Sequence, residues 1–470
     1  MNIAPHFERA LARGLGSSRL ARAALSLVLS GCALIGGAGV ANASVDPGNA
    51  IFGARLGGSS TIHVATDLEQ NIVIAGSFEG VLEIGGVGGA RLVSQDESDI
   101  FVAKLSSAGK LVWAERVGGA GSQLGLAVAT DLDGNIVVTG STRAPVGQGS
   151  QAPSSEIFVA KLDASGQQVF AMSFGHMHTG IGLGAAVSDK GEITIVGRFS
   201  GIARFDDFAI KSSPDANGDA IVLRLAQNGR VLWGHALGGL GEQYAGAVAA
   251  APNGGVVLSG LFSGTLELDG KQHTSTGTPS AFVVAMDDRG CVRFSRNLGP
   301  SLGDIPRLAV DPSGDVVVAG TYQGRLELDA GMLLSAGEDD VFALKLDAYG
   351  APVFLRGFGD AGSQQLGGVA VDAQGGIALA MSSLGNVDLG AGPLEGHGGY
   401  DVALVKLDAL GAPQWGRTFG DHHDQLAGDV VVDAAGNIVL AGQFAGSIDL
   451  GDSALQATAG FDAFLTSLEP

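Results

Sequence analysis

One short stretch of this chain recurs along most of its length and constrains the fold more than any other feature. At residues 130–140 it reads TDLDGNIVVTG, in which a turn-forming Asp-Gly pair separates two apolar runs. The residue that follows the turn recurs at intervals of 57 to 64 residues, at Asn71, Asn135, Glu192, Gly255, Asp315, Gly376 and Asn437. Self-similarity at a fixed period of this size indicates one supersecondary unit, copied here seven times.

The same stretch has the appearance of half a calcium loop, because Asp131, Asp133 and Asn135 alternate oxygen-bearing side chains around a glycine. A calcium loop keeps its carboxylates, since the number of oxygen ligands sets its affinity. The copies do not keep them: the position of Asp133 is occupied elsewhere by Glu69, Lys190, Asn253, Ser313, Gln374 and Ala435. The repeated stretch is therefore predicted to be a tight hairpin rather than a metal site.

Each copy contains further segments in a constant order. The strand after the turn is followed by a variable segment, such as residues 262–277, which is predicted to form a small extra hairpin. A third strand of the type DIFVAKL (99–105) comes next, and a second turn leads to a fourth strand with an aromatic residue. Four hairpin-connected strands in about 61 residues are typical of one propeller blade, and 77 glycines suit a chain with so many turns.

The fourth strand predicts how the ring closes. Its aromatic residues are Trp113, Phe170, Trp233, Phe294, Phe354 and Trp415, and the seventh copy ends at Pro470 without one. The missing strand is found in AIFGARLGG (50–58), where Phe52 lies 61 residues before Trp113. We therefore expect an all-β fold over residues 46–470, a single seven-bladed propeller whose N-terminal strand completes the last four-stranded blade and removes open sheet edges. All three tryptophans are predicted to pack between blades.

The repeats resemble the bacterial seven-bladed β-propeller repeat family often called SBBP. The resemblance rests on GNIVVTG, DIFVAKLSSAGKLVW and VGGAGSQ with their counterparts, and it covers residues 46–470. It implies a scaffold found in exported bacterial proteins, and it implies no shared reaction and no shared catalytic residues.

Residues 1–43 are expected to be an export signal. Arg9, Arg13, Arg19 and Arg22 form a basic region, and a short apolar run rich in small residues follows. Two processing sites compete. LSGC (29–32) resembles a lipobox, which would make Cys32 the lipid attachment site of a lipoprotein; ANA before Ser44 resembles an ordinary signal-peptidase site. Either leads to an extracytoplasmic protein, as an outer-membrane lipoprotein, in the periplasm or secreted.

Charge and cysteine content exclude several classes of partner. The formal net charge is −21, and removal of residues 1–43 leaves 23 basic and 47 acidic residues. Such a surface repels nucleic acid and anionic membranes, so membrane contact is expected only through a lipid anchor. Cys291 is the one cysteine besides Cys32, which leaves no intramolecular disulfide. We expect a monomer without a cofactor.

The loops that enter each blade are the default place for a binding site, since loops on a rigid scaffold commonly carry function. The fold predicts that they gather around the channel mouth. The ligand-face candidates are Gln123, His176, His178, Gln243, Gln364, Asp421, His422, His423, Asp424 and Gln425. Histidine and carboxylate groups are ligands for zinc, but the two histidine-containing loops lie four blades apart and each alone offers few ligands, so no metal site is assigned.

Two common catalytic motifs are absent from the sequence, since there is no His-Glu-x-x-His and no phosphate loop. No acid or serine departs from the repeat in a way that marks a triad, and no catalytic residue is assigned. Lysines recur in the third strand, where a structural role at a solvent-facing or channel-edge position is expected: Lys104, Lys161, Lys345 and Lys406. The leading hypothesis is a non-enzymatic scaffold that binds a protein or glycan at the cell envelope through its loop face. The alternatives are an extracytoplasmic hydrolase or lyase at the channel mouth, and a passive surface protein.

Overall fold

The regular structure of this protein consists of strands. The computed structural model describes residues 49–84, 89–95, 97–143, 155–174, 177–205, 207–214, 217–275, 278–299, 304–390, 392–451, 454–458 and 460–470. Within these ranges the one helical element is a short 3-10 turn at Pro252–Gly254, so the all-β prediction is confirmed. No helix in this part of the chain is long and apolar enough to cross a membrane. The expected export signal, including Cys32, lies outside the described residues.

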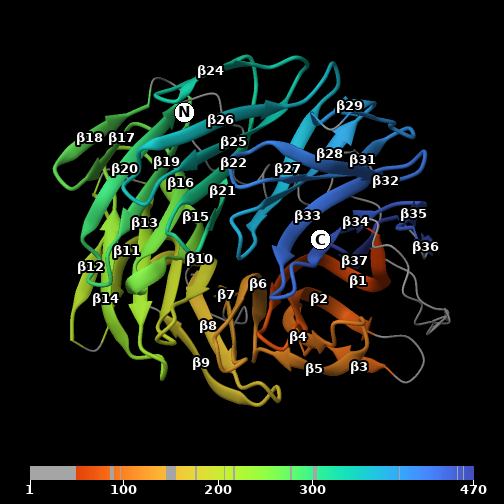
Figure 1. Ribbon diagram of the computed structural model, residues 1–470. Coiled ribbons are helices and arrows are strands. Elements are labelled where there is room, and N and C mark those ends of the chain that lie inside the picture. The colour runs from red at the N-terminus through yellow and green to blue at the C-terminus, as the bar shows by residue number, and fades with distance from the viewer. Residues whose placement is uncertain are drawn as a thin grey trace.

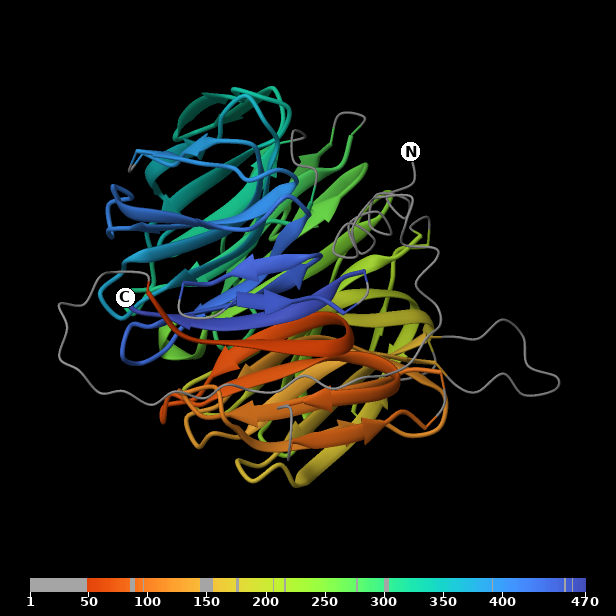
Figure 2. The ribbon, with the colours of Figure 1, turned by 90° about the vertical axis from the view of Figure 1, so that its right-hand side faces the viewer.

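The strands form antiparallel four-stranded units in which each strand pairs with the next along the chain. Figure 1 shows these units arranged around a common centre, with first strands such as β6, β21 and β27 nearest to it, and Figure 2 shows them from the side. The complete units are β6 (Ser122–Thr130), β7 (Ile136–Arg143), β8 (Ser155–Leu162), β9 (Gln168–Phe174); β10 (Met177–Val187), β11 (Ile193–Arg204), β13 (Asp219–Leu225), β14 (Val231–Leu237); β15 (Gln243–Ala250), β16 (Val256–Phe262), β19 (Ser280–Met286), β20 (Val292–Gly299); β21 (Arg307–Val310), β22 (Val316–Tyr322), β25 (Asp340–Leu346), β26 (Pro352–Phe358); β27 (Gln364–Val371), β28 (Ile377–Leu384), β31 (Tyr400–Leu407), β32 (Pro413–Phe419).

In the six units whose variable segment the structure describes, the residues between the second and third strands form small extra ladders, as expected from the sequence. Some are separate hairpins and others are single short strands on the edge of the second strand. They are β3 (Ala90–Val93), β12 (Ala209–Lys211), β17 (Thr265–Leu268) with β18 (Lys271–Thr274), β23 (Arg325–Leu328) with β24 (Gly331–Leu334), β29 (Val387–Asp388) with β30 (Pro393–Leu394), and β35 (Ser447–Asp449) with β36 (Ala454–Gln456).

Strand β1 (Ala50–Thr66) belongs to two units at once. Its first half pairs with β37, in a ladder that extends from Ala50 to Leu56. Its second half pairs with β2. The first half is therefore the fourth strand beside β33, β34 and β37, and the second half is the first strand beside β2, β4 and β5. The remaining strands of these two units are β2 (Ile72–Ile84), β4 (Asp99–Leu105), β5 (Leu111–Val117), β33 (Gln425–Val432), β34 (Ile438–Phe444) and β37 (Asp462–Leu468).

Two side-chain contacts fix the first half of β1. The guanidinium of Arg55 lies 2.8 Å from the Asp462 carboxylate, which is almost fully buried. The hydroxyl of Thr466 donates a hydrogen bond to the carbonyl of Phe52 at 2.6 Å. Strands β1 and β37 are thus joined by a ladder, an ion pair and a hydrogen bond.

The hydrophobic core lies between units rather than within them. Third strands such as β4 and β13 are buried at every position, because both faces of each sheet are covered by a neighbour. One core cluster joins Ile72 and Phe101 of the β2–β4 sheet to Val439 and Leu465 of the last unit. Burial on both sides explains why these strands read as continuous apolar runs instead of alternating ones.

The aromatic residue of most fourth strands packs on a turn of the following unit. A Cβ atom on Gly166 would lie 2.9 Å from the Trp113 ring, and one on Gly109 would lie 2.5 Å from the Phe52 ring. Only glycine leaves room for these rings, and both glycines have positive φ. The indole N–H of Trp113 donates to the carbonyl of Ala164 at 3.2 Å. Packing between units is therefore the role of Trp113, as predicted, and Phe52 takes the equivalent place.

Candidate functional site

Both carboxylate oxygens of Asp131, in the turn at residues 131–135, already accept hydrogen bonds within this unit. One oxygen of Asp131 accepts hydrogen bonds from the backbone N–H groups of Asp133 and Asn135, at 3.0 and 2.9 Å. The other accepts from the Asn135 side chain at 2.8 Å and from Lys161 at 3.0 Å. Burial raises the pKa of the Asp131 carboxyl, but the bonds from Asn135 and Lys161 outweigh burial and lower it overall. The stretch is a turn locked by its own aspartate.

The recurrent lysines are buried, and the expectation that they face solvent or the channel edge is wrong. Their exposure is between 4 and 6%. The ammonium groups reach the aspartate of the preceding turn instead, because a charge on a strand covered on both faces needs a partner. The pairs are Lys104–Asp67 at 2.7 Å, Lys161–Asp131 at 3.0 Å, Lys345–Asp311 at 3.0 Å and Lys406–Asp372 at 2.5 Å. Their role is structural, as expected.

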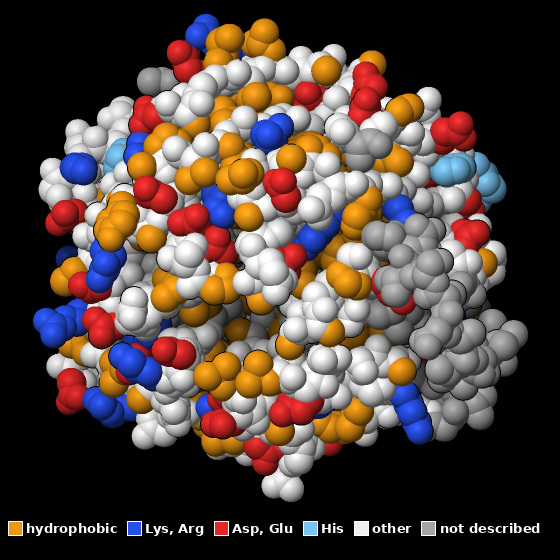
Figure 3. Space-filling model, viewed as in Figure 1, with side chains coloured by type: hydrophobic (Ala, Val, Ile, Leu, Met, Phe, Trp, Pro, Cys, Tyr) orange, Lys and Arg blue, Asp and Glu red, His pale blue; other side chains and the backbone are white. Residues whose placement is uncertain are grey.

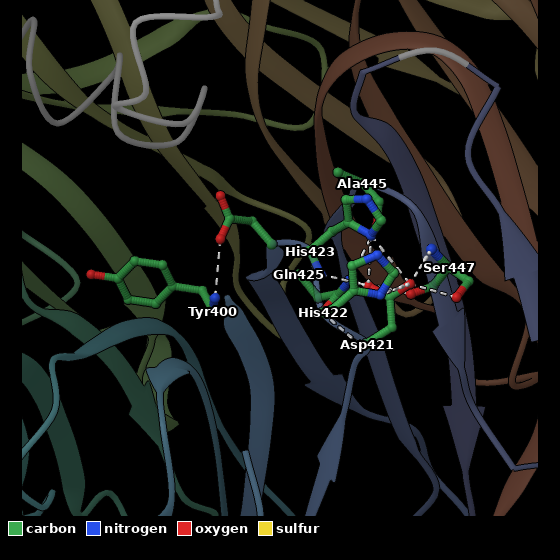
Figure 4. Close-up of polar contacts among 8 residues, drawn as sticks. Tyr400, Asp421, His422, His423, Gln425, Ala445 and Ser447 are labelled. Carbon is green, nitrogen blue, oxygen red and sulfur yellow. Dashed lines mark hydrogen bonds and ion pairs between the residues drawn. The ribbon is translucent and has the colours of Figure 1, made fainter. Parts of the chain in front are cut away.

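The loop at residues 420–425 holds the largest group of site candidates (Figure 4). Asp421 fixes the loop: its Oδ2 atom accepts from the backbone N–H and the hydroxyl of Ser447, at 2.8 and 2.6 Å. Its Oδ1 atom accepts from the backbone N–H of His423 and from Gln425, both at 2.8 Å. Burial raises the pKa of Asp421, but these bonds dominate and hold the carboxyl well below its usual range.

The two histidines of this loop point outward from that fixed base. The side chains of His422 and His423 are 77 and 45% exposed, and their ring centroids lie 3.9 Å apart. Among the described residues, Asp421, His422 and His423 form the one group of three with ligand atoms within 4.8 Å of one another. Both oxygens of Asp421 already have hydrogen-bond donors, so the group is explained as a loop anchor that carries two imidazoles. Asp424 accepts a hydrogen bond from the backbone N–H of Tyr400 at 3.0 Å.

The four glutamines among the candidates lie beneath the loops. Their exposure is at most 2%. The amide of Gln243 donates to the carbonyls of Leu240 and Thr265 at 3.1 and 3.0 Å, and Gln425 donates to Ala445 and Ser447 in the same manner. Gln364 and Gln123 bond to neighbouring loop and strand atoms. In this structure the glutamines hold the loops in place and do not present their amides at the surface.

The remaining candidates lie apart from that loop. His178 is exposed at the start of β10, and His176 lies outside the described residues. Cys291 is an exposed free thiol. The loop candidates do not appear among the residues that line the central cavity. Consistent with this, the face in Figure 3 is hollowed near its centre, and the histidine side chains visible on it lie toward its edge.

That central cavity has a volume of about 130 Å³ and receives residues from β1, β6, β10, β15, β21, β27 and β33, the first strand of every unit. This arrangement is a β-propeller. No other element contributes to the lining, so the cavity lies on the axis around which the units are arranged (Figure 1).

Three ionisable side chains line the cavity: His63 on β1, Arg307 on β21 and Asp429 on β33. Each occupies the same position of its repeat, eight residues before the residue that follows the repeated turn in that copy (Asn71, Asp315 and Asn437). In the other four copies the same position is Ala127, Gly184, Ala247 and Gly368, and these also line the cavity. The propeller therefore carries three charged or titratable groups and four small residues at one level of its axis.

His63, Arg307 and Asp429 differ in the contacts that their side chains make. The Asp429 carboxylate accepts from the backbone N–H groups of Val64 and Val430 at 3.2 and 3.0 Å, and it lies 4.0 Å from Nδ1 of His63. Arg307 is exposed, and its guanidinium has no ion pair with any residue in the described ranges. Burial lowers the pKa of His63, Asp429 acts to raise it and Arg307 to lower it, so that the imidazole is neutral at neutral pH.

This group was not predicted from the sequence. His63, Arg307 and Asp429 were not among the candidates, and the expectation that no acid departs from the repeat in an informative way does not hold for Asp429. A signal was present, because charged residues replace alanine or glycine at one repeat position. It becomes meaningful only when that position is known to face the axis.

Comparisons with known proteins agree with a propeller and go no further. No family model matches the chain. Over 155 residues it is 30% identical to the uncharacterized WD repeat-containing protein L264 of Acanthamoeba polyphaga mimivirus, an alignment that spans 29% of this chain and only 11% of the viral protein.

Several solved structures resemble the chain at low identity. They include the Pan2 WD40 domain of Neurospora crassa, with 11% identity over 88% of this chain and 90% of that one and a TM-score of 0.42. They also include Sqt1 from Chaetomium thermophilum, with 11% identity, coverage of 90 and 99% and a TM-score of 0.40. A PL25 ulvan lyase has 11% identity, coverage of 84 and 93% and a TM-score of 0.45. The fold assignment itself rests on the strand pairing and the central cavity.

Proposed function

We propose that this chain is a closed seven-bladed propeller of the exported bacterial repeat type and that it acts as a non-enzymatic binding scaffold. Closure is supported by the ladder between Ala50–Leu56 and β37 and by the core cluster shared by the first and last units. Rigid closure matters for binding, because a scaffold without free edges holds its loops in fixed positions.

The observation that carries the binding role is the rigid presentation of two imidazoles. His422 and His423 are strongly exposed, while Asp421 beneath them makes hydrogen bonds to Ser447 and Gln425. A polar pair held in this way loses little conformational freedom when a partner binds, which favours affinity. Imidazole groups donate and accept hydrogen bonds, so the partner is a protein or a glycan that offers hydroxyl, amide or carboxylate groups.

The test compares the full chain with a His422→Ala/His423→Ala variant, in which Asp421 is kept because it fixes the loop. Tyr349→Ala is the matched control, since Tyr349 is 86% exposed and lies in the turn between β25 and β26 of another unit. Proteins captured from envelope and secreted fractions are identified and purified, and direct binding is then measured by titration; a glycan array is run in parallel. We expect saturable binding that is lost in the double variant and kept in the control. Equal binding by all three proteins would show that His422 and His423 are not part of the binding site.

Export is the second part of the proposal. The basic and apolar segments of residues 1–43 support it. Expression of the full chain in a bacterial host, followed by fractionation, tests whether it leaves the cytoplasm. A lipid label retained by the parent and lost in Cys32→Ser would assign the lipoprotein form, and an N-terminus at Ser44 would assign the released form. Accumulation in the cytoplasm would contradict both.

An enzyme at the channel remains the second candidate, because one observation favours it. A neutral imidazole near a carboxylate, with a cation across the same cavity, is a set that general-base chemistry uses. The described lining contains no serine, threonine or cysteine, so it provides no hydroxyl or thiol nucleophile for a hydrolase. A lyase that abstracts a proton through His63 is the enzyme form this cavity supports, and turnover abolished by His63→Ala would be its signature.

A further inference from the structure

The axial cavity holds opposite charges that do not neutralise each other. Around the axis the cavity-lining residues follow in the order Arg307, Gly368, Asp429 and His63, on β21, β27, β33 and β1. Gly368 places no side chain between Arg307 and Asp429, and a Cβ atom there would lie only 2.9 Å from the backbone nitrogen of Val430. The guanidinium thus remains unpaired within the described chain, while Asp429 is bonded to backbone N–H groups.

The cavity is open to solvent and of limited size. The side chains of His63 and Asp429 are 24 and 35% exposed, so a solute can reach them. The volume is about 130 Å³, and a cavity of roughly 150 Å³ holds a molecule the size of benzene. A ligand with about six or seven non-hydrogen atoms therefore fits this space.

We propose that this cavity binds a small α-amino acid as its zwitterion, with the carboxylate on Arg307, the ammonium group on Asp429 and the side chain beside His63. An arginine fork matches a carboxylate by two parallel hydrogen bonds. A carboxylate anchored by backbone N–H groups keeps lone pairs for an ammonium donor. Alanine has six non-hydrogen atoms and serine seven, and a serine hydroxyl can bond to the neutral imidazole. The remaining lining consists of aliphatic and glycine residues, which limits the side chain to a small one.

This site is separate from the loop described above and does not depend on a macromolecular partner. It is carried by three observations that are independent of one another: the shared repeat position, the unpaired guanidinium and the open volume of the axial cavity. Loss of the loop function would leave it intact, and the reverse also holds.

Isothermal titration of the full chain with L-alanine and L-serine tests the proposal. Propionate, which lacks the ammonium group, and alaninamide, which lacks the carboxylate, are titrated in parallel. We expect saturable binding of the amino acids below about 10 mM, a range typical of ligands of this size. Each of the two incomplete probes should bind at least about tenfold more weakly, because one charged contact is missing.

Variants locate the binding. Arg307→Gln and Asp429→Asn should each weaken L-alanine binding by about tenfold or more, since a charge-assisted bond is lost. Arg325→Gln is the control, because Arg325 lies in an exposed pair with Glu327, and it should bind as the parent does. Circular dichroism confirms that each variant is folded; if one is not, the ranking of probes on the parent decides. The absence of saturable binding by either amino acid, propionate binding equal to that of alanine, or unchanged affinity in both axial variants would each overturn the proposal.

Discussion

Leu56 lies at the junction on which the proposed closure of the propeller depends. It is the last residue of β1 that pairs with β37, it is 1% exposed, and it packs in the cluster that includes Val439 and Leu465 of the last unit and Ile72 of the first. Truncation to alanine removes three carbon atoms from that shared core. Leu→Ala changes at such positions cost about 2–5 kcal/mol, depending on how far the cavity collapses, and whole domains are stable by only about 5–15 kcal/mol.

The measurement is the guanidinium chloride midpoint of the full-length Leu56→Ala variant, followed by fluorescence and by circular dichroism so that a non-coincident transition is detected. Leu68→Ala is the matched control, because Leu68 is 57% exposed in the first turn and its truncation should change stability by at most about 0.5 kcal/mol. We also expect a protease to cleave the Leu56→Ala variant faster than the parent within strands β1 and β37. If both variants unfold at the same midpoint, β1 does not close the structure in solution and the reasoning is refuted.

Three further predictions concern buried polar groups. Lys161→Met leaves the Asp131 carboxylate buried without its partner and should destabilise the fold by about 3–5 kcal/mol, whereas Arg325→Met in an exposed pair should cost less than about 1 kcal/mol; equal denaturation midpoints would contradict this. Burial raises the pKa of Asp219, although bonds from Ser213 act to lower it, so its contribution to stability is present below the unfolded pKa of about 3.9 and is lost as pH rises through the higher folded value. Asp219→Asn should therefore flatten the decline of the thermal midpoint above pH 4, and an unchanged slope would argue against the raised pKa. Ser447→Ala removes a hydroxyl bond to Asp421 and should speed amide exchange at His423, with exchange at Val222 in the core strand β13 as the internal reference; unchanged exchange at His423 would show that the loop is fixed by other contacts.

Local chemistry in the sequence was sufficient to predict much of the fold. Turn-forming pairs between apolar runs mark hairpins because they depend on neighbouring residues alone, and their regular spacing marks the repeated unit. The in-phase position of Phe52 predicted that the N-terminal strand would join the last unit, and β1 pairs with β37. The lysine of the third strand was correctly judged structural, but its burial was not foreseen. Whether a strand position is exposed to solvent depends on the neighbouring sheet that covers it, and the sequence of the strand does not specify that sheet.

The candidate sites also combine features that are visible in the sequence with features that only the folded chain reveals. The glutamines were visible as a recurrent residue, but only the folded loops reveal that their amides are enclosed and bonded to backbone carbonyls. His63, Arg307 and Asp429 are distant in sequence, and each alone is an ordinary polar residue. The repeated four-stranded unit could be predicted from the residues alone, because hairpin formation and period are local properties. Which repeat position faces the axis depends on the fold, because the arrangement of units around a common centre brings that position from every copy into one cavity.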